Sequence, residues 1–473
     1  MTTLHEIHVG PGGTFEPSGK FHTRPDDIDA LFDHLRATNV DAITLHFHGG
    51  LVPEKDGVEI AKMMRPVYEA ANTYPISFVW ETGLIRTLRQ NVTRVHQTKL
   101  FQKLLKWVIK RAAERFGGLD GKGPGAAVAV STIESELAKD RPFEDYDDGS
   151  TGKGASRGGA IAVTEADFGM LRADLEAEFA EIVDEDEEIE ALLAEKDGEV
   201  KIDTSRRGIF TAGKLIKALA HITFRVIRRH VRDRDHGFYP TVVEEVLREY
   251  YLADLGAWVW GSMKDKAGAM WACNEDALDD DRHVGTYFLD VLHAFRAERD
   301  LRVNLVGHSA GSIVIANLLA AADRYSGLTF GTIAFLAPAV TSSVAAAQIA
   351  RAPQKYGSFR QYTMSDEFER NDMLVPGVYT RSLLYFISGV LEPDGVDKPI
   401  AGMMRHATQQ KPFDRGSARE WADFILGPNR LALADSSVLD PAAEEGFRTT
   451  STTHGGFDND KKTQESLTVL LQN

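Results

Sequence analysis

Apolar strand-like runs alternate with amphipathic helical segments, and this alternation limits most strongly what the chain can fold into. The alternation occupies both ends of the chain and is absent from the middle. The expected strands cover residues 4–9, 42–47, 76–80, 302–306, 329–336 and 359–363. The expected helices beside them cover residues 26–35, 59–71, 286–295, 312–322 and 461–471. Because alternating strands and helices build a parallel sheet with helices on its faces, the sequence predicts an α/β fold.

A long helical segment separates the two parts of this alternation. Residues 85–116 are basic, 165–199 are acidic and 206–234 are basic again, with apolar residues at helical spacing. The sequence therefore predicts a core made of residues 1–83 and 284–473, with a large helical insertion or cap over 84–283. A glycine-rich run at 147–159 is expected to be a flexible loop.

Charge and cysteine content exclude several classes of protein. The 473 residues include 54 Lys and Arg against 70 Asp and Glu, a net charge of −16, so we expect no nucleic-acid partner. Cys273 is the single cysteine, which excludes an intramolecular disulfide and suits a reducing compartment. No run is apolar for long enough to span a membrane, and the N-terminus does not resemble a secretory signal. We expect a cytoplasmic protein without a metal site.

The most specific motif is Gly307-His308-Ser309-Ala310-Gly311, a G-x-S-x-G pattern between a predicted strand and a predicted helix. A nucleophile on such a turn projects from strained backbone, and the flanking glycines remove side chains that would collide with the strand and helix. The helix N-terminus behind it offers N–H groups to a developing oxyanion. Ser309 is therefore the expected nucleophile, and His308 is expected to pack or orient rather than act as the base.

A second motif, His46-Phe47-His48-Gly49-Gly50-Leu51, ends an early predicted strand. Successive glycines let backbone N–H groups approach a substrate carbonyl, as acyl transfer requires. We expect the oxyanion donors to be Gly50 and Leu51 on this loop, together with Ala310 after the nucleophile.

A nucleophilic serine needs a base, and the base needs an orienting carboxylate. His454 lies among small and hydroxyl residues just before the last predicted helix, and is preferred to His406, whose context is more helical. Asp366 follows the predicted strand at 359–363 and is the expected acid, with Asp372 as its nearest rival.

The order Ser309, Asp366, His454, after an early HGG strand end, resembles the α/β-hydrolase superfamily, and the G-H-S-A-G elbow resembles that of its esterase and lipase-like members. The resemblance covers residues 1–83 and 284–473. It implies an eight-stranded, mostly parallel sheet, a Ser-His-Asp triad and no cofactor. The chain departs from many such esterases in having Leu51 where they have a third glycine, and in placing its insertion after the strand at 76–80.

These observations predict a serine hydrolase that cleaves carboxylic esters, from small molecules or lipids, through an acyl-enzyme. An amidase or thioesterase would use the same triad, and a non-catalytic binding or scaffold protein would keep the same fold. The basic helices offer a possible peripheral contact with anionic membranes. The competing interpretation is that they pair with the acidic segment. The sequence leaves the oligomeric state open.

Overall fold

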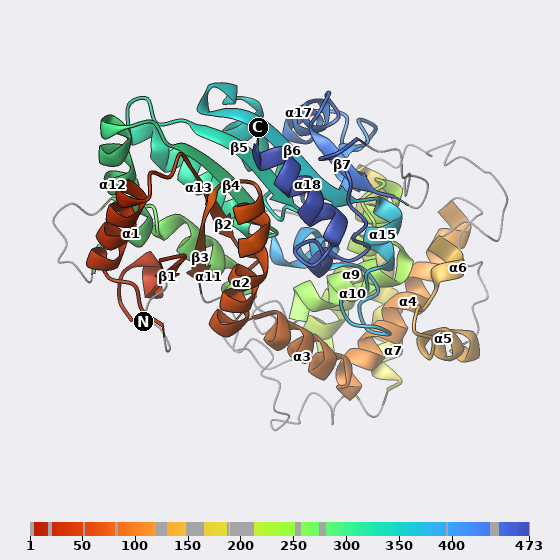
Figure 1. Cartoon of the computed structure of the whole chain (residues 1–473). Coiled ribbons are helices and arrows are strands. Elements are labelled where there is room, and N and C mark those ends of the chain that lie inside the picture. Colours follow the sequence, from red (N-terminus) through yellow and green to blue (C-terminus); the bar gives the residue numbers. More distant parts are fainter. Residues whose placement is uncertain are drawn as a thin grey trace. The chain divides into compact units, whose positions relative to one another are not determined.

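The computed structural model describes residues 4–17, 21–50, 53–80, 84–119, 130–147, 165–186, 189, 212–250, 257–273, 281–393, 396–435 and 444–472. These residues belong to two compact units. The sheet unit consists of Met1–Thr87, Trp258–Asp372 and Pro399–Asn473, and the helical unit of Leu88–Ala257 and Met373–Lys398. Figure 1 labels the elements of both units.

The sheet unit is built on seven strands in the order β1-β3-β2-β4-β5-β6-β7, and every neighbouring pair is parallel. The strands are β1 (Glu6–Val9), β2 (Ala42–Phe47), β3 (Tyr74–Trp80), β4 (Arg302–His308), β5 (Phe330–Leu336), β6 (Tyr356–Met364) and β7 (Leu431–Ala434). Its α-helices are α1 (Pro25–Ala37), α2 (Glu54–Ala70), α11 (Ala257–Ala269), α12 (Val284–Glu298), α13 (Gly311–Ala321), α14 (Ser342–Ala345), α15 (Asp366–Asn371), α17 (Gly416–Ile425) and α18 (Lys461–Gln472). Strand β4, which leads into the G-x-S-x-G turn, is the central strand of the sheet.

Helices cover both faces of this sheet. On one face Phe32 of α1 packs against Phe288 of α12, and Phe288 also meets Phe78 of β3. Side chains alternate along a strand, so neighbouring positions point to the other face. On this second face α2 and α18 lie side by side, as Figure 1 shows, over a core that includes Val306 of β4 and Leu467 of α18.

The α/β class predicted from the alternation is confirmed, because the parallel sheet and its flanking helices follow that pattern. The described sheet has seven strands, whereas the family resemblance implied eight. Strand β7, L-A-L-A, was not expected. The other strands lie at their predicted positions: β1 and β5 begin two residues and one residue later than predicted, and β3, β4 and β6 are longer, with β6 beginning at Tyr356.

The helical unit has its own apolar core. Its helices are α3 from Leu88 onward (Leu84–His96), α4 (Lys99–Leu119), α5 (Val130–Leu137), α6 (Glu144–Asp147), α7 (Glu165–Asp184), α9 (Ala212–Val231), α10 (Phe238–Tyr250) and α16 (Leu383–Phe386). Helix α9 contacts α4, α7 and α10. The apolar stripes predicted from helical spacing are buried there, with Leu104 of α4 and Leu219 of α9 fully inaccessible.

Basic residues of α4 pair with acidic residues of the same unit. The Lys103 ammonium lies 2.6 Å from the Asp186 carboxylate, and Arg115 forms an ion pair with Glu178. The Lys106 ammonium contacts Glu134 at 2.9 Å. These contacts support the interpretation that the basic and acidic segments neutralise each other inside one helical unit.

A buried ionic cluster joins residues 373–398 to the rest of the helical unit. His236 binds the Glu244 carboxylate through Nδ1 at 2.7 Å and the Asp397 carboxylate through Nε2 at 2.9 Å. Arg229 completes the cluster with ion pairs to Glu244 and Glu245, at 2.7 and 3.0 Å. Buried charges of both signs in direct contact offset much of the cost of removing each from water.

The division into units differs from the expected one at both ends of the insertion. Residues 258–283 lie in the sheet unit, where the Trp271 ring packs 6.2 Å from Phe47 and 5.9 Å from Phe78.

Of the glycine-rich run predicted at 147–159, only Asp147 lies within the described residues. Among the described helices, none is both long and apolar enough to cross a membrane.

Candidate active site

Ser309 occupies a strained turn between β4 and α13. Its φ of 51° lies in the left-handed region that side chains other than glycine rarely adopt. The Ser309 N–H donates to the Leu336 carbonyl at 2.8 Å, and the Ser309 carbonyl accepts from the Ala339 N–H at 3.0 Å. Bonds to the segment at the end of β5 thus hold the turn in place, and strain of this kind is found at functional sites.

The two glycines of the motif are required by close approach. A Cβ on Gly307 would lie 2.7 Å from Ile315 Cδ1 on α13. A Cβ on Gly311 would collide with the Phe47 carbonyl oxygen at the end of β2. Both positions therefore let the strand, the turn and the helix meet, as the motif predicts.

The HGG loop after β2 lies against this turn. A Cβ on Gly49 would stand 3.5 Å from Ser309 Cβ, and one on Gly50 only 2.6 Å from Ala310 Cβ. The Gly50 position also touches Met263 of α11. Gly50 and Ala310, two of the expected oxyanion donors, are thus brought together, and the third, Leu51, lies outside the described residues. Among the described residues, no hydrogen-bond acceptor takes the Ala310 N–H.

His454 reaches Ser309 as expected for a general base. It begins the short 3₁₀ helix η9 (His454–Gly456), and its Nε2 lies 2.9 Å from Ser309 Oγ. Both side chains are largely enclosed, with Ser309 4% and His454 5% exposed. The rival His406 has a structural place: its Nδ1 accepts the Ile400 N–H at 2.9 Å, and its ring packs on Phe413.

The expected acid, Asp366, is not joined to this pair. It is the first residue of α15, directly after the Ser365 N-cap, and it is partly exposed. Asp372, just beyond the same helix, accepts the backbone N–H of His454 through Oδ2 at 2.7 Å. The His454 Nδ1 atom has no hydrogen-bond partner among the described residues. The structure therefore brings Asp372, and not Asp366, into contact with the base.

A carboxylate–imidazole pair, Asp458 and His308, lies beside His454 and was not predicted. His308 Nδ1 contacts Asp458 Oδ2 at 2.6 Å, and His308 Nε2 contacts the His454 carbonyl oxygen at 2.9 Å. Asp458 is four residues after His454, between η9 and α18, a spacing that could have pointed to it. His308 was expected to pack or orient, and its contact with the His454 backbone agrees with an orienting role.

The electrostatics of the cluster separate its histidines into two kinds. Burial lowers the pKa of His46 and of His48 to about 4 in each case. Burial, and next the charge of His308, lower the pKa of His454 to about 3. Burial also opposes a charge on His308, but the Asp458 carboxylate outweighs it and raises the pKa of His308. The same contact overcomes burial at Asp458 and lowers the pKa of that carboxyl.

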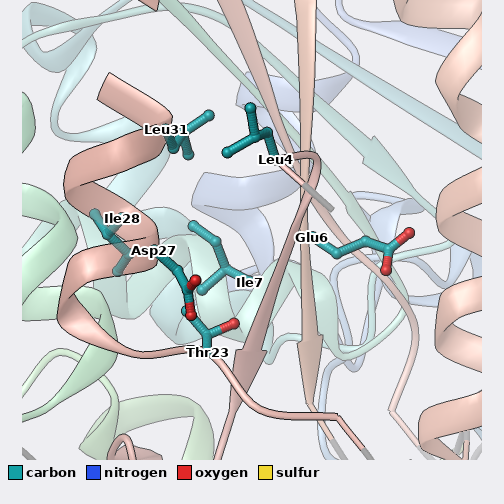
Figure 2. A pocket seen from close by; sticks show the side chains of 7 residues that line it. All are labelled: Leu4, Glu6, Ile7, Thr23, Asp27, Ile28 and Leu31. Carbon is teal, nitrogen blue, oxygen red and sulfur yellow. The ribbon is translucent and has the colours of Figure 1, made fainter. Parts of the chain in front are cut away.

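A small cavity lies elsewhere in the sheet unit, between β1 and α1 (Figure 2). Its volume is about 20 Å³, room for roughly one water molecule. The lining residues are Leu4, Glu6, Ile7, Thr23, Asp27, Ile28 and Leu31. Strand β1 is an edge strand, whereas Ser309 follows the central strand β4, so this cavity does not belong to the Ser309 site.

A comparison with models of known protein families, with curated proteins and with solved structures finds no match for this chain. The geometry of the site is therefore the basis for a functional assignment. Within the described ranges, no group of three or more His, Cys, Asp or Glu side chains is placed to hold a metal ion.

Proposed function

We propose that the protein is a serine hydrolase with an α/β-hydrolase core, acting on carboxylic esters through an acyl-enzyme. One observation carries the proposal: the Ser309 hydroxyl, at a φ of 51° on a strand–turn–helix elbow, lies 2.9 Å from His454 Nε2. A strained serine paired with a neutral imidazole is the arrangement that activates a hydroxyl for attack on an acyl carbonyl.

The proposed reaction has two steps. Ser309 Oγ attacks the ester carbonyl while His454 Nε2 takes its proton and then delivers it to the leaving alkoxide. Water, deprotonated by the same nitrogen, releases the acid from Ser309. We assign the orienting carboxylate to Asp372, because it accepts the backbone N–H of His454 at 2.7 Å and so helps to fix the position of the base. This assignment replaces Asp366.

The oxyanion of the tetrahedral intermediate is proposed to bind the N–H groups of Ala310 and of the HGG loop. Ala310 precedes α13, so its N–H lies at the positive end of the helix dipole. The close approach of the Gly50 and Ala310 positions supports the proposal that their N–H groups bind one oxygen. Leu51 is retained as a third donor of this proposal.

The proposed substrates are small-molecule or lipid esters, and a cytoplasmic location is proposed from the single cysteine. Esters are preferred over amides because an alkoxide leaves with less assistance than an amine. A thioesterase or amidase is the alternative on the same triad. A scaffold role is disfavoured, because a packed core does not need a strained serine beside a buried histidine. The ion pairs of α4 argue against an additional nucleic-acid or membrane surface on that helix.

A panel of chromogenic substrates tests the reaction class. We expect kcat/KM for p-nitrophenyl esters to exceed that for the matching thioester and p-nitroanilide. The acid limb of the ester pH–rate profile should lie at least about 1 pH unit below the ordinary imidazole value near 6.5. The reason is that the base must be neutral, and the lowered pKa of His454 keeps it neutral as the pH falls. A higher rate on the anilide, or a limb above pH 6.5, would contradict this proposal.

A further inference from the structure

We infer that Asp458 and His308 form a charged positioning pair for the base, in which the His308 imidazolium holds the His454 backbone and keeps the His454 ring unprotonated. The inference deepens the proposed function and depends on it for its kinetic consequence. Its structural content, the charge state of two neighbouring histidines, can be measured without any substrate.

The hydrogen-bond geometry indicates the charge on His308. Its Nδ1 faces the Asp458 carboxylate at 2.6 Å, and its Nε2 faces the His454 carbonyl oxygen at 2.9 Å. A carbonyl oxygen can only accept, and an ionised carboxylate can only accept as well. Both ring nitrogens of His308 therefore donate, which requires the imidazolium form. The pair is buried, with Asp458 2% and His308 6% exposed, so water does not compete for these bonds.

The His308–Asp458 pair links the strand that carries the nucleophile to the backbone of the base. His308 is the residue before the nucleophile, at the end of β4, so its ring is fixed by the central strand. Its Nε2–H fixes the carbonyl of His454, whose own N–H is held by Asp372 at 2.7 Å. The His308–Asp458 pair thus holds the carbonyl of His454, and Asp372 holds its N–H. This double anchoring holds the ring within reach of Ser309 Oγ.

The surrounding titratable groups leave His308 as the cation of the cluster. His46 on β2 binds the Tyr68 hydroxyl of α2 through Nδ1 at 2.6 Å. His48 donates from Nδ1 to the Gly49 carbonyl and accepts the Trp80 N–H at Nε2, which defines a neutral ring. Burial holds the pKa of both near 4, so neither carries charge at neutral pH.

A cation beside the base has a consequence for catalysis. The His308 and His454 ring centres are 5.7 Å apart. At that separation a full charge at an effective dielectric constant near 20 shifts a neighbour's titration by on the order of 2 pH units. Of the two charges in the pair, His308 has the larger effect on His454 and acts to lower its pKa, while Asp458 partly opposes it. The pair therefore extends the pH range over which the base is ready to accept the serine proton.

Histidine NMR on the wild-type chain tests the charge assignment directly. Protein labelled with ¹⁵N in histidine should show an imidazolium at pH 7 whose signals vanish in His308→Gln, and a neutral ring for His454 down to at least about pH 5.5. A neutral His308 at pH 7, with the shared proton on Asp458, would overturn the inference. This measurement does not require enzymatic activity. The only variants that it requires are those used to assign the histidine signals.

Matched variants test the kinetic consequence. Glutamine at position 308 keeps an N–H donor for the His454 carbonyl but carries no charge, and leaves Asp458 as an uncompensated anion. The acid limb of the pH–rate profile should move up by on the order of 2 pH units in His308→Gln. It should move up by a smaller amount in the double variant with Asp458→Asn, in which both charges are gone. His293→Gln, at an exposed position of α12, is the control and should leave the limb unchanged.

The outcomes separate this inference from the proposed function. If the limb does not move in either variant while the wild type hydrolyses esters, the pair does not act on His454 and only this inference fails. If the single variant does not fold, the double variant has no unpaired charge and gives the same test. If the wild type is inactive on every ester, the proposed function fails, and the NMR titration still decides whether His308 is charged.

Discussion

Ser309→Ala should lower kcat/KM for p-nitrophenyl ester hydrolysis by a factor of about 10⁴–10⁶, an effect that we expect only His454→Ala to equal among single changes. The substitution removes the oxygen that forms the acyl-enzyme, and the remaining oxyanion donors give only the residual catalysis of a bound substrate. The free energy of unfolding should stay the same or rise, because alanine has no hydroxyl to bury. Steady-state kinetics and a urea titration measure the two quantities.

The partner of the serine supplies the control for this experiment. His454→Ala should reduce kcat/KM to the same level, and the double variant should be no slower than either single variant, because the two groups act as a unit. His406→Ala lies in the same unit but away from Ser309, and at equal folded concentration it should keep most of the activity. Activity above a tenth of wild type in purified Ser309→Ala would remove Ser309 as the nucleophile.

Asp372→Asn should lower kcat by a factor of about 10²–10⁴. Asparagine has the same shape and still offers an oxygen to the His454 N–H, so the position of the backbone is kept. It lacks the negative charge that, in the proposed mechanism, stabilises the imidazolium formed when His454 takes the serine proton. The large effect should therefore appear in kcat, with a small change in the free energy of unfolding.

The comparison with Asp366→Asn decides between the two carboxylates. Asp366 begins α15 and is partly exposed, so its replacement should change kcat by less than about a factor of three, as surface changes usually do. A large loss in Asp366→Asn with little change in Asp372→Asn would restore the assignment made from the sequence. Equal losses in both would show that the acid is shared or lies elsewhere.

The parts of the site that follow local rules could be predicted from the sequence. The elbow is encoded within five residues, because its glycines are needed wherever β4, the turn and α13 approach one another. The HGG loop is predictable for the same reason, since its glycines lie against Ser309 and Ala310. Six of the seven described strands were predicted from their apolar runs, and only β7 was missed.

The remaining features depend on contacts between residues distant in the chain. The choice between Asp366 and Asp372 depends on where α15 ends, and the sequence does not fix that to within one helical turn. The contact between His308 and Asp458 joins residues 150 positions apart. Likewise, Asp397 joins the helical unit through His236, 161 positions away, and no local pattern marks that pairing. Such contacts are set by packing, whereas local patterns report only turn and helix chemistry.

Covalent capture by a fluorophosphonate probe tests the central claim most directly, because the probe reacts with activated serines and requires no knowledge of the substrate. Intact-mass analysis of the folded wild-type chain should show one added phosphonyl group, and peptide mapping should place it on Ser309. Ser309→Ala and urea-unfolded wild type should remain unlabelled, and His454→Ala should label far more slowly. A folded wild-type chain that stays unlabelled, or that is labelled equally in Ser309→Ala, would contradict the account.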